Sequence, residues 1–175
     1  MKLFGPLSRA ILVAGAVAAA GTLPAMAAPA DIALLKSYLG TYNGKGTLTG
    51  SQTEPVTCKM SMSSGNGDKV NYTGRCQIAG QQLSVTGTIA YIDDHKRYEA
   101  VMNTGIGGFR GVAVGVKQGS NIVFDLQQRA NDNAGNDISI AAKIVLTAAG
   151  ISVDFHAKFN QTGDTVDAKV PFTKA

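Results

Sequence analysis

From residue 40 to the C-terminus, apolar and polar residues alternate one by one, the period of strands with one buried face. In the clearest run, Ile140, Ile144 and Leu146 share one face, and Asp137 and Lys143 lie on the other. Short segments rich in Gly, Asn and Asp interrupt the alternation. The pattern predicts strands over about residues 41–50, 54–63, 69–79, 82–92, 96–103, 109–117, 121–129, 136–148, 150–159 and 164–172.

A single short helix precedes these strands. Ile32, Leu35 and Leu39 fall on one helical stripe, which predicts a helix over Ile32–Leu39. Asp31 is a suitable N-cap and Gly40 follows the last turn, where glycine commonly ends a helix.

The segments between the predicted strands are only two to six residues long, so sequential strands are expected to pair antiparallel. A sandwich and a barrel both satisfy such a pattern. An uninterrupted meander favours an all-β, antiparallel up-and-down β-barrel of about 8–10 strands. An outer-membrane barrel would place its apolar residues outward between aromatic girdles, and this chain has no Trp.

Residues 1–27 have the organisation of an export signal. Lys2 and Arg9 precede an uninterrupted apolar run over residues 10–20, and Ala25-Met26-Ala27 forms a cleavage motif. The run is too short to span about 30 Å of hydrocarbon. We expect cleavage after Ala27, a single barrel domain over 28–175, and a periplasmic or secreted bacterial protein.

Removal of the predicted export signal lowers the net positive charge of the chain. The chain of 175 residues carries a net charge of +4, but two of its cations lie in the predicted signal. The remainder has 14 Lys and Arg against 12 Asp and Glu, with no cluster of like charge. The basic patch expected of a nucleic-acid-binding protein is therefore absent from the sequence.

Two cysteines, Cys58 and Cys76, are expected to form a disulfide in an oxidising compartment. A hairpin centred on Gly67 would place them directly opposite each other, together with Met62 and Tyr72. The spacing lacks the C-x-x-C pattern of redox-active or metal-binding pairs, which indicates a structural role.

The segment Leu39-Gly40-Thr41-Tyr42, after a short helix and before a β-meander, resembles the calycin superfamily of lipocalins, fatty-acid-binding proteins, avidins and nitrobindin-like barrels. Gly40-x-Tyr42 is similar to the lipocalin G-x-W motif, with Tyr in the Trp position. The resemblance implies a barrel and identifies no particular ligand. The Trp cluster of avidins is absent, so the resemblance does not extend to biotin binding.

The inward faces of the predicted strands would line the barrel interior with apolar groups and a few Tyr hydroxyls. The candidate ligand-binding residues are Met60, Met62, Tyr72, Tyr91, Tyr98, Met102, Phe124, Phe155 and Phe159. Phe109 and Arg110, in a glycine-rich hairpin, are loop candidates at the barrel mouth. A filled interior without a ligand is the alternative.

No catalytic or metal-binding set is recognisable in the sequence. Both cysteines are expected to be bridged, and His95 lies in a predicted turn. His156 shares its parity with Asp154 and Lys158 and should point outward. Nitrobindin-like barrels would suggest haem ligation, which requires His156 to face the interior. The oxygen-rich segment 131–137 lacks the final Glu of a helix-flanked calcium loop.

The sequence thus predicts an exported, non-enzymatic β-barrel that binds a small hydrophobic ligand, without a cofactor or bound metal. The alternative is a periplasmic protein–protein module, such as a protease inhibitor or a surface or virulence-associated protein.

Overall fold

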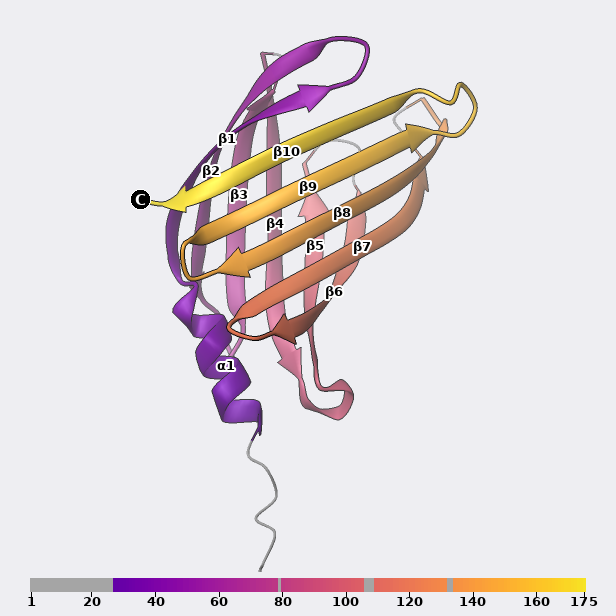
Figure 1. The fold of residues 1–175 in the computed structure, drawn as a ribbon. Coiled ribbons are helices and arrows are strands. Elements are labelled where there is room, and N and C mark those ends of the chain that lie inside the picture. The colour runs from indigo at the N-terminus through magenta and orange to yellow at the C-terminus, as the bar shows by residue number, and fades with distance from the viewer. Residues whose placement is uncertain (1–26, 79, 106–108, 132–133) are drawn as a thin grey trace, which may run out of the picture.

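The structure, a computed structural model, is a closed antiparallel barrel with a helix at one end (Figure 1). It describes residues 27–78, 80–105, 109–131 and 134–175. The elements are α1 (Ala27–Ser37), β1 (Gly40–Thr49), β2 (Thr53–Ser64), β3 (Val70–Ile78), β4 (Gln81–Ile92), the 3-10 turn η1 (Asp93–His95), β5 (Arg97–Thr104), β6 (Arg110–Gln118), β7 (Asn121–Asn131), β8 (Asp137–Thr147), β9 (Gly150–Phe159) and β10 (Thr165–Lys174).

Each strand pairs antiparallel with its sequence neighbours, and β1 pairs with β10 to close the ring. The predicted fold class is therefore confirmed, with ten strands. Every observed strand lies within about two residues of its predicted limits, because the alternation and the turn residues are both local signals.

The helix differs from its prediction. It begins at Ala27, so Asp31 lies inside it and is not its N-cap. Asp31 is buried, and its carboxylate accepts hydrogen bonds from Lys117 Nζ at 3.1 Å and Tyr98 OH at 3.3 Å. Its side chain therefore joins the helix to β5 and β6. Gly40 starts β1 with a φ of 139°, in a region that L residues rarely adopt.

The predicted export signal lies almost wholly outside the described residues. Cleavage after Ala27 stays a prediction, and so does the domain boundary at residue 28. Within the described part of the chain, no helix has the length and hydropathy needed to cross a bilayer.

The disulfide prediction is confirmed. β2 pairs with β3 in the predicted register, which places Cys58 opposite Cys76 and Met62 opposite Tyr72. The two cysteines are bonded, with a Cα–Cα distance of 4.0 Å. The turn Gly65–Lys69, with Gly67 and Asp68 at positive φ, sets this register.

Three inward aromatic rings lie over glycines on a neighbouring strand. Phe124 covers Gly115, Phe172 covers Gly44, and Tyr72 covers Gly87. In each case a Cβ on the glycine would lie less than 3 Å from the ring. The glycines thus leave room for each side chain to pack close against the wall.

We expect Gly87→Ala to lower the free energy of unfolding by about 1–3 kcal/mol, the usual cost of overpacking. A Cβ at Gly87 would lie 2.0 Å from the Val101 carbonyl oxygen and 2.4 Å from the Tyr72 hydroxyl. Gly74→Ala is the matched control, since its Cβ would meet nothing nearer than 3.9 Å. Urea denaturation measures both, and equal stabilities of the two variants would contradict the packing argument.

Candidate functional site

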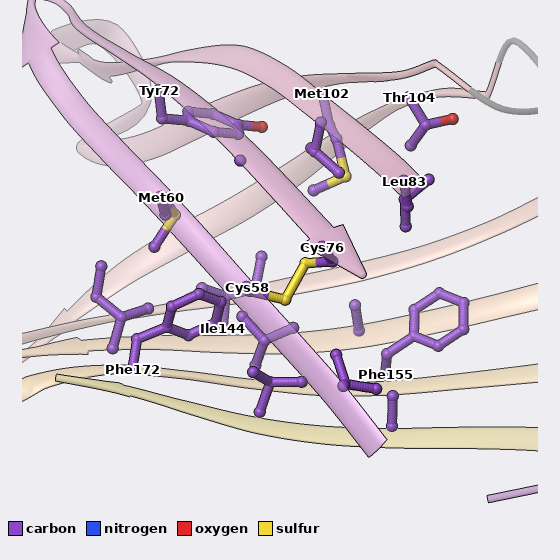
Figure 2. A pocket seen from close by; sticks show the side chains of 18 of the residues that line it. Cys58, Met60, Tyr72, Cys76, Leu83, Met102, Thr104, Ile144, Phe155 and Phe172 are labelled. Carbon is purple, nitrogen blue, oxygen red and sulfur yellow. A yellow bond between two sulfur atoms is a disulfide. The ribbon is translucent and has the colours of Figure 1, made fainter. Parts of the chain in front are cut away.

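The barrel holds a cavity of about 620 Å³ that is only partly closed off from solvent. All the strands except β6 contribute lining residues, mainly from their inward positions, and the lining is almost entirely apolar. Figure 2 shows Tyr72, Leu83 and Met102 on one side of this space and Ile144, Phe155 and Phe172 on the other. The barrel side chains therefore leave an unfilled interior, in contrast to the close packing of most protein cores.

Most of the sequence-predicted candidates line the cavity. The structure brings together Met60, Met62, Tyr72, Met102, Phe124 and Phe155, together with the loop candidate Phe109. Their shared position follows from strand parity, since each occupies an inward place in a strand or, for Phe109, immediately before one.

Four other candidates do not line it. Tyr91 and Tyr98 pack edge to face, with ring centroids 5.1 Å apart, in the region covered by α1. Phe159 ends β9 half-buried and outside the set of cavity residues. Arg110 is exposed on the outer surface, beside Val112.

Contacts with helix α1 explain why Tyr91 and Tyr98 do not line the cavity. Leu35 is fully buried, and Tyr98 is 1% exposed. The Tyr98 hydroxyl also lies 3.2 Å from the Asp31 carbonyl oxygen. Tyr38 OH donates to the Ser120 carbonyl at 2.7 Å, and Lys36 pairs with Asp68. Helix α1 is thus attached to the β2–β3 and β6–β7 turns, and it covers this end of the barrel (Figure 1).

Tyr72 supplies a hydroxyl to a largely apolar wall. It donates a hydrogen bond to the Val101 carbonyl oxygen at 3.1 Å. Burial raises the pKa of this hydroxyl well above its usual value near 10. Tyr72 is therefore neutral at physiological pH, and its oxygen keeps acceptor capacity for a polar group in the cavity.

The sequence interpretation overlooked the small inward residues that create the space. Gly74, Ala100, Ala142 and Ala168 all line the cavity. Their signal is a small residue on an inward position of a predicted strand. The disulfide also belongs to the lining, with its sulfurs facing the interior (Figure 2).

The histidines lie away from the cavity. The side chain of His156 is 47% exposed, and its Nδ1 lies 2.7 Å from Asp167 Oδ1 on the outer face, as its parity predicts. Haem ligation by His156 stays a hypothesis that this geometry does not favour. His95, in η1, is also exposed, and its Nδ1 lies 3.8 Å from Glu99 Oε1. Within the described residues, no cluster of three or more His, Cys, Asp or Glu could hold a metal ion.

No protein-family model and no curated protein sequence matches this chain. Solved structures do match its fold. Rv2717c from M. tuberculosis is 12% identical, with a TM-score of 0.66, over 82% of this chain and 96% of that one. The S-type phycobiliprotein lyase CPES from Guillardia theta is 8% identical, with a TM-score of 0.55, over 82% and 91%. The similarity is one of fold, an antiparallel β-barrel, and assigns no family.

We expect the protein to lose stability as the pH rises above about 10. Burial, followed by the charge and hydrogen bond of Asp31, raises the pKa of Tyr98, and burial alone raises that of Tyr72. Above pH ~10 the unfolded chain releases phenolic protons that the folded protein retains, so the free energy of unfolding falls. Urea denaturation from about pH 8 to 11 measures this fall. The free energy of unfolding should fall less steeply with pH in Tyr72→Phe than in the unmodified protein. An equally steep fall in both would contradict the raised pKa of Tyr72.

Proposed function

We propose that this protein is an exported barrel that binds a small hydrophobic molecule in its interior. The observation that carries the proposal is the apolar cavity of about 620 Å³. Protein interiors are normally packed without voids much larger than a water molecule. Ligand sites commonly measure about 300–1,000 Å³ and combine apolar walls with a few polar groups. This cavity has both the size and the composition of such a site.

The lining also indicates the class of ligand. Its walls are aliphatic, aromatic and sulfur-containing, with Tyr72 OH, Thr104 and Gln81 among the few polar groups. Thr104 ends β5 and Gln81 starts β4, so both lie at the end of the barrel away from α1. A molecule with an apolar body and a polar end near Gln81 and Thr104 fits this distribution.

Binding without catalysis is the simplest reading of this lining. Its described residues include no His, Asp or Glu, and its two cysteines are bonded to each other. Its titratable side chains are those of Tyr72 and of Lys59, which occupies an exposed, outward-parity position of β2. We therefore infer no general acid–base pair or activated nucleophile in this lining. The similarity to a phycobiliprotein lyase, at 8% identity, is one of fold and supplies no catalytic residue.

Export is supported by two features. The N-terminal segment has the composition of a secretory signal. The Cys58–Cys76 disulfide is of the kind that persists in oxidising compartments, such as the bacterial periplasm. We therefore propose that the ligand is encountered outside the cytoplasm.

Filling the cavity should weaken ligand binding. Ala142 lines the cavity, whereas its neighbour Ala141 occupies the outward position opposite His156. We expect Ala142→Phe to weaken the binding of N-phenyl-1-naphthylamine at least tenfold, because the new ring occupies the space the probe needs. Fluorescence titration gives the affinity, and thermal denaturation confirms that the variant is folded.

Ala141→Phe is the matched control, since it adds the same ring to the outside of the same strand. Its probe affinity should match that of the unmodified protein. Equal binding by all three proteins, or no binding by any of them, would refute an interior site. Native mass spectrometry of periplasmic material before and after lipid extraction then identifies the natural ligand by mass.

A further inference from the structure

The barrel wall is incomplete between β6 and β7. Their pairing ends at Val114 opposite Asp125. β6 nevertheless continues in register with β5 to Arg110, and β7 continues with β8 to Asn131. The two strands therefore separate over the half of the wall that lies away from α1, while each keeps its other neighbour (Figure 1).

Side chains fill the resulting gap. Gln128 lies on the inward parity of β7, and its Nε2 donates to the Arg110 carbonyl oxygen at 2.8 Å. A Cβ at position 111 would lie 2.9 Å from Gln128 Oε1 and 3.0 Å from the Phe109 ring. Gly111 thus leaves room for both side chains. Among the described residues, the Gln128–Arg110 hydrogen bond and the Phe109 ring bridge this part of the wall in place of a backbone ladder.

The gap has open space on both sides. Phe109 and Leu126 line the interior cavity. On the outer side is a shallow, open depression, lined by Val101, Asn103, Arg110, Gly111, Val112, Gln127 and Gln128. Phe109 and Gln128 therefore stand between a surface depression and the apolar interior.

The outer surface beside the gap is unusually apolar. Val101 and Val112, which pair across β5 and β6, are 47% and 51% exposed. Val114 and Val116 continue the row along β6. On the inward positions of this strand, Gly111, Ala113 and Gly115 are small, and Lys117, nearer α1, reaches Asp31. β6 thus presents its larger apolar side chains to the outside, next to the gap.

We propose that the ligand reaches the cavity sideways, between β6 and β7, across the exposed valines and past Gln128 and Phe109. This inference rests on the proposed function of the interior. The ligand is the same hydrophobic molecule, and the valines give its apolar body a surface to contact before it passes the wall. Passage requires breaking one amide hydrogen bond and rotating side chains, and it leaves the backbone ladders of β5–β6 and β7–β8 intact.

A covalent bridge across the gap tests this route. Continuing the β6–β7 register would place Val112 opposite Gln127, both exposed on the outer face. The double variant Val112→Cys, Gln127→Cys is joined with a short bis-maleimide, which does not touch the native disulfide. We expect stopped-flow uptake of N-phenyl-1-naphthylamine to slow at least tenfold after bridging, with its equilibrium affinity unchanged.

The matched control is Asp125→Cys, Lys143→Cys, an exposed pair that lies opposite across the intact β7–β8 ladder, bridged by the same reagent. Its uptake rate should equal that of the unmodified protein. A second pair of variants tests the amide: Gln128→Ala should speed uptake, and Gln77→Ala, an exposed glutamine on β3 away from the gap, should not. If the protein bridged at 112 and 127 binds the probe with normal affinity and takes it up at an unchanged rate, the lateral route is overturned and the proposed function is not. No binding by the unmodified protein would overturn the proposed function as well.

Discussion

Closure of the sheet by the β1–β10 ladder is the constraint on which the rest of the structure depends. A closed barrel has no edge strands, and its diameter grows with the number of strands. Barrels of eight strands have an interior that side chains can just fill. Ten strands make a wider ring, and small inward residues such as Gly74 and Ala142 widen the free space further. The cavity is thus a consequence of circumference and side-chain volume together.

The wall around this cavity is organised by cross-strand contacts. Phe124, Phe172 and Tyr72 each pack against a glycine of the adjacent strand, so these large side chains lie close to the wall. The disulfide joins the inward side chains of Cys58 on β2 and Cys76 on β3 into one compact bridge. These features keep the lining apolar while leaving the interior open.

The two ends of the barrel are built differently. At one end, Leu35 is fully buried, and Asp31 joins α1 to Tyr98 and Lys117. Several independent contacts hold this closure. Toward the other end, β6 and β7 separate, and Gln128 bridges them with one hydrogen bond. Local stability in proteins follows the density of such contacts, so motion that admits a ligand is expected where they are few.

Local chemistry made much of the fold predictable. Alternation and turn residues depend on only a few neighbouring positions. The predictions of the strand limits, the Cys58–Cys76 pairing and the outward direction of His156 were therefore all correct. The same signals identified Met60, Tyr72 and Phe155 as interior residues. The helix was less predictable. Asp31 has the chemistry of an N-cap, but its carboxylate instead binds groups from distant strands.

The sequence by itself therefore determined the strands, their order and the face of each side chain. Only the tertiary structure decided that the interior is unfilled, that α1 diverts Tyr91 and Tyr98 from the cavity, and that β6 parts from β7. The reason is physical. The direction of a side chain depends on its own strand, whereas an empty volume, a covered end or a gap in the wall depends on the sum of side chains from elements far apart in the chain.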